Sequence, residues 1–373
     1  MDEIQYFQEL ADKIKQKELV VADRSRHKIP YTTIDGVFDD LTDRDICWWT
    51  NGFWGGMMWQ LYHATGEMLY RDAAEENERK LDQNLMRHWG MDHDSGFKWL
   101  TTAVADYRIT GNQESYNRAR LAADNLAGRY NPAGRFIRAW NDGGDGSKAG
   151  WAIIDCMMNL PLLYWAYEET RDPRYYHIAT SHADTAMRYF IRQDGSANHI
   201  VEFDPMTGEY IRTYGGQGYG EGSSWTRGQA WALYGFTLSF LHTKNEEYLN
   251  CARRAANYFL MNIPENGLIP VDFRQPSDCK LEDSTAAAIA SCGLLELAKY
   301  VGNTEQKVYH GTAVRMLRIL AENRCDFTVE KDNLLEKCTA AFHDEKHEFS
   351  IIYGDYFFIE AVWKLTGQEL FIW

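Results

Sequence analysis

The chain of 373 residues carries 54 acidic and 39 basic residues, which gives a formal net charge of −15. Broad binding to nucleic acid or to an anionic membrane requires basic surface, so this charge argues against both classes of partner. No segment approaches the roughly 18 apolar residues that a membrane-spanning helix needs.

The seven cysteines form no CxxC pair and show no Cys/His spacing typical of a metal site. Cys156, Cys251 and Cys292 lie on apolar faces of predicted helices, which indicates free, buried thiols and a reducing compartment. The acidic N-terminal segment does not resemble a signal peptide. We therefore expect a cytoplasmic protein without a metal or organic cofactor.

The first predicted element is a helix over residues 2–17, whose apolar residues fall on one side. After it, one pattern recurs six times: an aromatic-rich helix, a short turn with Gly, Asn or Asp, and a second, amphipathic helix. The first helices are expected to begin near residues 49, 96, 152, 226, 284 and 352. The second helices are expected over 68–87, 113–129, 174–192, 246–262 and 305–323.

Repeated helix pairs that cannot bury their own apolar faces stack on their neighbours. The last pair has no second helix, and the N-terminal helix can supply it and close a ring of twelve. The second helices carry the charged residues, whereas the first helices are poor in charge, which places the first helices inside. The sequence therefore predicts one all-α domain over residues 1–373 with the architecture of an (α/α)6 barrel.

The long connections lie at one end of this predicted ring. Residues 131–150, 193–224 and 264–283 each join an outer helix to the next inner helix. The runs HIVEFD and EYIRTY flank the turn DPMTGE, so a short β-hairpin is expected within 193–224.

Aromatic and acidic residues gather at the same end. Nine of the thirteen tryptophans, residues 48, 49, 54, 89, 99, 140, 151, 225 and 231, lie in these loops or in the first turns of inner helices. They can form aromatic walls for sugar rings, or they can fill the top of the barrel. The acidic residues at this end are Asp92, Asp94, Asp155, Asp283 and Asp355.

Asp155 stands out because it follows two isoleucines in the apolar stretch AIIDCMMNLPLL, where a charge is costly unless it is paired or used. An N-cap is the alternative for Asp155 and for Asp94, and it is the preferred reading of Asp283. Two buried carboxyl groups at one site would raise a pKa and provide a proton donor at neutral pH. Arg227 on an inner helix should meet an anion, either a ligand or a carboxylate of the barrel mouth.

The motifs WTNGFWGGMMW, HDSGF, IIDCMMNLPLL, SSWTRGQAWALYGF, DSTAAAIASCGLLE and IIYGDYFFIEA, taken together, resemble glycoside hydrolase family 88, the unsaturated glucuronyl hydrolases. They span residues 48–361 in order. The family often has Asp where this chain has Asn51. The resemblance implies an (α/α)6 barrel, in agreement with the repeat count.

The resemblance also implies the chemistry. The substrate would be an unsaturated oligosaccharide from chondroitin, hyaluronan or heparin, left by a polysaccharide lyase. A carboxylic acid protonates C4 of the 4,5-unsaturated uronic acid, water adds at C5, and the hemiketal opens and releases the remaining sugar. Asp155 matches the general acid/base and Asp94 the second essential carboxylate. The implied substrate-binding residues are Trp49, Phe53, His93, Trp140, His199, Gln217, Arg227 and Trp231.

Two other functions fit the same pattern. One is an unsaturated rhamnogalacturonyl hydrolase on the same barrel, and the other is a non-catalytic carbohydrate-binding toroid. Lys346 and Ser350, in the segment before the last inner helix, could meet a sulfate group or could be solvated loop residues.

Overall fold

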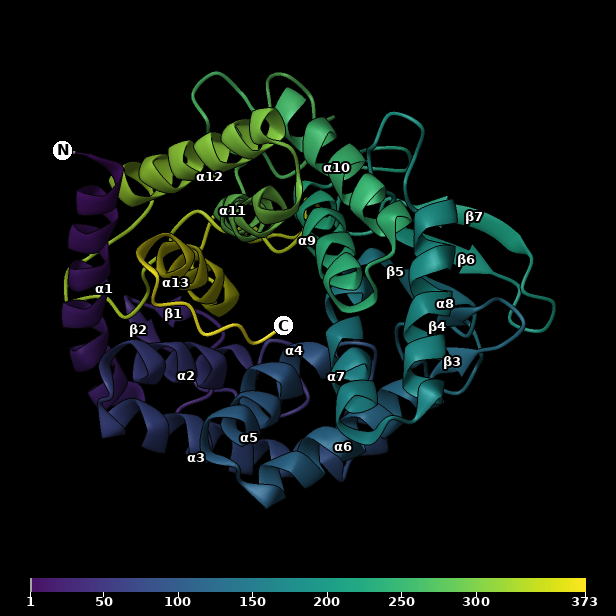
Figure 1. Ribbon diagram of the computed structural model, residues 1–373, viewed down its shortest axis with the longest axis horizontal. Helices are drawn as coiled ribbons and strands as arrows, with labels where there is room; N and C mark the ends of the chain where they lie inside the picture. Colours follow the sequence, from purple (N-terminus) through teal and green to yellow (C-terminus); the bar gives the residue numbers. More distant parts are fainter. Residues whose placement is uncertain (1) are drawn as a thin grey trace.

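The computed structural model describes residues 2–373 and shows two concentric layers of helices (Figure 1). The outer layer contains α1 (Glu3–Ser25), α3 (Met68–Leu85), α6 (Gln113–Gly128), α8 (Pro173–Tyr189), α10 (Glu246–Met261) and α12 (Asn303–Asn323). The inner layer contains α2 (Phe53–Thr65), α4 (Ser95–Trp99), α5 (Ala105–Thr110), α7 (Leu160–Thr170), α9 (Thr226–Thr243), α11 (Ser284–Leu297) and α13 (Ile352–Thr366). A π-helical turn, Leu100–Val104, joins α4 to α5 as one inner rod. The predicted (α/α)6 barrel is confirmed.

The two layers differ as their sequences require. All residues of α11 are buried, because this helix has neighbours on every side. Outer helix α10 buries one stripe of residues and exposes its charged side. Helices α2, α5, α7 and α9 each end at a left-handed residue, as at Gly66 (φ 75°), whose N–H donates to the carbonyl of Tyr62.

Helix α1 closes the ring, as predicted, by packing against α13 and α3. It continues to Ser25, beyond the predicted end at residue 17. The extension continues the buried stripe of the helix through Val21, Ala22 and Ser25, and the Lys17 ammonium group donates to the carbonyls of Asp326 and Asn333, both at 2.6 Å.

The third inner helix begins later than predicted. Trp151–Ile153 form strand β5, Ile154–Met158 form a 3₁₀ turn, and α7 begins only at Leu160. Bulky residues at 151–154 favour an extended backbone, and β5 pairs with β6 (Ile200–Phe203). The prediction of a helix from residue 152 was therefore wrong, and Asp155 lies in the turn between a strand and a helix.

Short strands decorate the mouth of the barrel. The predicted hairpin is present as β6 and β7 (Tyr210–Tyr214), and β5 adds a third antiparallel strand. Two small ribbons, β1 (Thr33–Ile34) with β2 (Val37–Phe38) and β3 (Tyr130–Asn131) with β4 (Phe136–Ile137), lie in the other connections.

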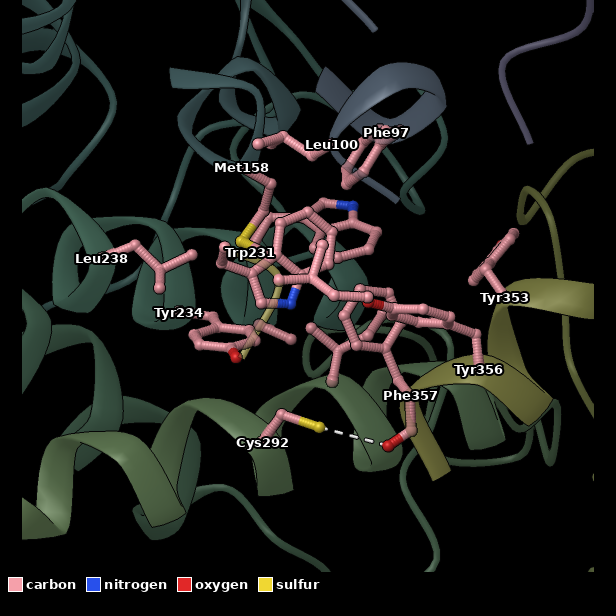
Figure 2. Packing of buried hydrophobic residues seen from close by; sticks show 14 of the residues in the cluster. Phe97, Leu100, Met158, Trp231, Tyr234, Leu238, Cys292, Tyr353, Tyr356 and Phe357 are labelled. Carbon is pink, nitrogen blue, oxygen red and sulfur yellow. Dashed lines mark hydrogen bonds between the residues drawn. The ribbon is translucent and has the colours of Figure 1, made fainter. Parts of the chain in front are cut away.

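Large aromatic side chains fill the barrel axis below the mouth. Figure 2 shows Trp231 of α9 between Phe97 of α4 and Phe357 of α13. The ring centroids of Trp231 lie 5.1 Å from Phe97 and 5.5 Å from Phe357. This packed layer gives the cavity above it a rigid floor.

Cys156, Cys251 and Cys292 are free and buried, as predicted, and the other four cysteines are free as well. Within residues 2–373, no helix combines the length and apolarity needed to cross a membrane. The same residues contain no group of three or more His, Cys, Asp and Glu side chains placed to hold a metal ion.

Candidate active site

A cavity of about 510 Å³ opens at the mouth of the barrel. Its walls come from four connections that are far apart in sequence and from the first turn of α9. The lining residues are Asp45, Cys47, Trp48, Trp49, Arg87, Trp89, Gly90, Asp92, His93, Asp94, Trp140, Asp155, Gln217 and Arg227.

Asp155 lies in the 3₁₀ turn before α7 and retains 14% side-chain exposure. Its Oδ1 atom accepts no hydrogen bond from the described residues and does not cap a helix. Burial raises the pKa of Asp155 to about 7, against the opposing effect of the Arg227 charge. Asp155 can therefore carry a proton at neutral pH and present it to the cavity.

Asp94 occupies the N-cap position of α4 but makes no capping hydrogen bond. Burial, together with the charges of Asp92 and Asp155, raises the pKa of Asp94 well above its usual range. Both carboxylate oxygens of Asp94 have neighbours: Oδ1 accepts from Asn159 at 3.2 Å, and Oδ2 lies 3.4 Å from Nε2 of His93. These contacts hold Asp94 in place, whereas Asp155 is the freer acid.

Asn159 links the two acids and was missed in the sequence. Its Nδ2 atom donates to Oδ1 of Asp94 and to the backbone carbonyl of Asp155, both at 3.2 Å, and its Oδ1 accepts the N–H of Phe97 at 2.8 Å. Asn159 is completely buried, and Gly96 packs so closely that a Cβ there would lie 2.5 Å from the Asn159 Cα atom. The pattern DCMMNLP places this Asn just before a helix, where it looks like an ordinary cap.

His199, at the start of β6, reaches Asp155 from the hairpin. The backbone N–H of Gln217 donates to His199 Nδ1 at 3.0 Å, so the proton of the neutral ring belongs on Nε2. That Nε2 atom lies 3.8 Å from Asp155 Oδ1. Burial, followed by the charge of Arg227, lowers the pKa of His199 to about 3, so the ring is neutral.

Gln217 and Arg227 line the cavity, and both donate to the carbonyl of Ala340. Arg227 is 1% exposed and pairs with Asp283 Oδ2 at 2.8 Å. It also donates to the carbonyls of Thr339, at 2.6 Å, and of Ala340. Asp283 caps α11 as expected, so the alternative of a salt bridge to a mouth carboxylate is realised for Arg227. The Arg227 Nε atom is buried and has no hydrogen-bond partner among the described residues.

The predicted aromatic residues divide into two groups. Trp49 and Trp140 line the cavity, as do Trp48 and Trp89. Phe53 and Trp231 do not; both are fully buried in the aromatic layer beneath it, and Phe53 packs against Tyr356 at a centroid distance of 5.1 Å. The structure therefore places these two residues in the floor and not at the sugar-facing surface.

His93 lies behind Asp94. Burial lowers the pKa of His93 to about 4, and its backbone N–H donates to Ala139 at 3.1 Å. The neutral ring can serve as a hydrogen-bonding partner of the Asp94 carboxyl group or of a ligand in the cavity.

The sequence profile described as Glycosyl Hydrolase Family 88 matches residues 21–357. The chain belongs to this family. It is 36% identical to an unsaturated glucuronyl hydrolase of Bacillus sp. (strain GL1), over 90% of each chain. It is 34% identical to an unsaturated chondroitin disaccharide hydrolase of Streptococcus pneumoniae, over 91% of this chain and 87% of the relative.

Solved structures agree with this assignment of family 88. The crystal structure of an unsaturated glucuronyl hydrolase from Streptococcus agalactiae superposes with a TM-score of 0.90 at 30% identity, covering 100% of this chain and 94% of that chain. A variant of that hydrolase complexed with dGlcA-GalNAc6S gives a TM-score of 0.83 at 28% identity, with the same coverage. This family 88 protein is thus a glycoside hydrolase.

In this family 88 enzyme, Lys346 and Ser350 lie away from the cavity. They line a separate surface pocket of about 370 Å³, where the Lys346 ammonium group lies 4.7 Å from the ring centroid of Phe349. The Ser350 side chain accepts the backbone N–H of Thr33 at 3.1 Å. Neither residue faces the two acids.

Proposed function

We propose that this enzyme removes a 4,5-unsaturated uronic acid from the non-reducing end of lyase-generated glycosaminoglycan oligosaccharides by hydrating the C4=C5 double bond. The observation that carries the proposal is the Asp155 carboxyl group, which faces the cavity with a pKa raised to about 7 and an oxygen without a hydrogen-bond partner. An enol ether is protonated on carbon, and this step needs an acid that is still protonated at working pH.

The reaction begins when Asp155 donates its proton to C4 of the unsaturated sugar. Positive charge then develops at C5 and the ring oxygen, in a cavity that the carboxyl groups of Asp92 and Asp94 also line. The Asp155 carboxylate next accepts a proton from water as the water oxygen bonds to C5. The resulting hemiketal opens, and the remaining sugar leaves with its own oxygen.

The other side chains position the reactants. Gln217 fixes the tautomer of His199, so the neutral ring places its Nε2–H group near Asp155, with Nε2 at 3.8 Å from Oδ1, as a polar neighbour of the acid. Arg227, which lines the cavity, is the cation that would meet the uronic acid carboxylate. Trp49 and Trp140 offer aromatic faces to the sugar rings.

This chemistry places no nucleophile on the anomeric carbon. The carboxylate separation that distinguishes retaining from inverting glycosidases is therefore not a criterion for this site. Asp94 is instead the second carboxyl group of the pair, and its own pKa is raised by burial and by the charges of Asp92 and Asp155.

The experiment follows the ultraviolet absorbance of the C4=C5 double bond conjugated to the carboxylate. The folded protein is mixed separately with unsaturated chondroitin, hyaluronan and rhamnogalacturonan disaccharides. Loss of absorbance with chondroitin or hyaluronan disaccharides is the expected result. Loss with the rhamnogalacturonan disaccharide alone, or binding without any loss, contradicts the proposal.

A further inference from the structure

Two cations face the cavity, and they differ in their partners. Arg227 is buried and neutralised by Asp283. Arg87, on the turn before the 3₁₀ segment His88–Gly90, is exposed, and in the described part of the chain its guanidinium group forms no ion pair. Since the carboxyl groups of Asp45, Asp92, Asp94 and Asp155 also line this cavity, Arg87 is its one unneutralised cation among residues 2–373.

Exposed aromatic surface adjoins Arg87 on the same wall. Trp89 is 63% exposed and Trp48 is 37% exposed, yet both line the cavity. Large apolar side chains are normally buried, and exposed ones that lie together often mark a binding surface. Flat, accessible aromatic faces next to a polar cavity are suited to the apolar faces of a sugar.

Buried hydrogen bonds hold this wall in place. Lys98, which is fully buried, donates to the carbonyls of Gly90 at 3.1 Å and Cys47 at 3.4 Å, so it ties the turn that carries Arg87 to the segment that carries Trp48. Asn141 Nδ2 donates to the carbonyl of Trp89 at 2.7 Å and connects the turn to the Trp140 loop.

The wall is also tightly packed at its base. A Cβ atom at Gly90 would lie 2.3 Å from Cys47 Sγ, so the two segments touch directly. The backbone beneath Arg87 and Trp89 is therefore fixed, although their side chains are exposed, as in a preformed binding surface.

We propose that Arg87, Trp89 and Trp48 form a subsite for the leaving part of the substrate, in which Arg87 pairs with an oxyanion carried by that part. This inference rests on the proposed function and adds a specificity determinant to it. The oxyanion is either a sulfate ester on the second sugar or the carboxylate of a third sugar, since a guanidinium group binds both in a bidentate manner.

The test compares wild type, Arg87→Ala and Arg87→Lys on three substrates that end in the same unsaturated uronic acid. These are an unsulfated disaccharide, disaccharides carrying one sulfate, and an unsulfated tetrasaccharide. Lys346→Ala is the matched control, because it removes a cation from outside the cavity. Arg87 is exposed, so its replacement leaves the fold intact.

Arg87→Ala should lower kcat/KM about fivefold to tenfold for a sulfated disaccharide or for the tetrasaccharide, through KM, and leave the unsulfated disaccharide nearly unchanged. Loss confined to a sulfated disaccharide identifies a sulfate as the ligand, and loss confined to the tetrasaccharide identifies a carboxylate. Arg87→Lys should restore part of the loss, and the difference should shrink at high salt.

The subsite is refuted if Arg87→Ala lowers kcat/KM equally on all substrates, changes none of them, or behaves like Lys346→Ala. Failure of the proposed function has another signature, since wild type would then turn over none of the three substrates. Quenching of Trp fluorescence by the sulfated disaccharide that is weaker in Arg87→Ala than in wild type would still support the subsite in that case.

Discussion

Asp155 and Asp355 are two buried acids of the same barrel with opposite surroundings. Burial raises the pKa of each to about 7. Asp355, in the first turn of α13, accepts the backbone N–H groups of Leu334 at 3.0 Å and Leu335 at 2.7 Å and does not line the cavity. Asp155 has an unpartnered oxygen and faces the cavity.

The comparison shows that a raised pKa alone does not indicate a catalytic group. Burial raises the proton affinity of any carboxyl group, whether or not a substrate can reach it. Both carboxylate oxygens of Asp355 accept backbone N–H groups of residues 334–335 and so join α13 to that segment. Asp155 Oδ1 accepts no hydrogen bond from the described residues, and the proposed role of Asp155 in proton transfer rests on this difference.

The largest expected effect separates the two acids by activity. Asp155→Asn should lower kcat by about 10²- to 10⁴-fold, because the amide cannot donate a proton to carbon. Asp355→Asn is the matched control and should keep kcat close to that of wild type. Steady-state kinetics on an unsaturated disaccharide, with circular dichroism to verify folding, measure both. Comparable losses of kcat in Asp155→Asn and Asp355→Asn would contradict the different roles given to the two acids.

Asn159 provides a sharper test, because it acts only through the acids. Asn159→Ala should lower kcat roughly 10- to 100-fold by releasing the Asp94 carboxyl group from its position. Asn159→Asp keeps the shape but adds a third acid, and it should shift the descending limb of the pH–rate profile to higher pH. A loss of kcat in Asn159→Ala that merely follows a loss of folded protein would mean that Asn159 is a structural residue.

The stability of the two acid variants should also differ. In the unfolded chain the pKa of Asp155 returns to about 3.9, so its ionisation costs folding free energy increasingly from about pH 4 to pH 7. Asp155→Asn removes this cost, and it should raise the free energy of unfolding by about 1–4 kcal/mol at pH 8 and by little below pH 4.

Asp355→Asn also removes the cost of ionising a buried carboxyl group. However, the NH₂ group of the amide would face one of the two backbone N–H groups that the carboxylate now accepts, which should lower the free energy of unfolding by about 1–3 kcal/mol. Thermal unfolding at pH 4 and pH 8 should therefore rank Asp155→Asn above Asp355→Asn. A lower melting temperature for Asp155→Asn than for Asp355→Asn at pH 8 would show that burial of the ionised Asp155 carboxylate does not destabilise the fold.

The smallest expected effect concerns the aromatic wall. Trp140→Ala should raise KM roughly threefold to tenfold with little change in kcat, since it removes about 1 kcal/mol of apolar contact with the sugar. Trp231→Ala, in the floor, should lower the melting temperature by leaving a large void. A higher KM in Trp231→Ala without a lower melting temperature would indicate that Trp231 contacts the sugar and would contradict its place in the floor.

The sequence predicted the barrel well because its pattern is periodic. The pattern of an apolar inner helix followed by a turn recurs six times, and the predicted bounds of the five outer helices after α1 agree within three residues with the structure. The strand β5 was missed because three residues carry too little pattern, and it forms only by pairing with β6.

The candidate site was predictable only in part, because its residues come together from distant segments of the chain. Asp94, Asp155, His199, Gln217 and Arg227 do lie around one cavity or directly behind its wall. Phe53 and Trp231 could not be separated from cavity residues, because a helix that is apolar on all sides does not reveal which face points to the mouth. Asn159 acts across 65 residues of sequence, and such a contact leaves no local signal.

The most direct test of the account is the dependence of kcat/KM on pH for wild type and Asp355→Asn. The reactive form holds a protonated Asp155, so kcat/KM should fall above about pH 7 with a slope of one proton in both proteins. If kcat/KM instead stays constant or rises through pH 9, a protonated carboxyl group is not the acid, and the assignment of Asp155 to protonation of C4 is contradicted.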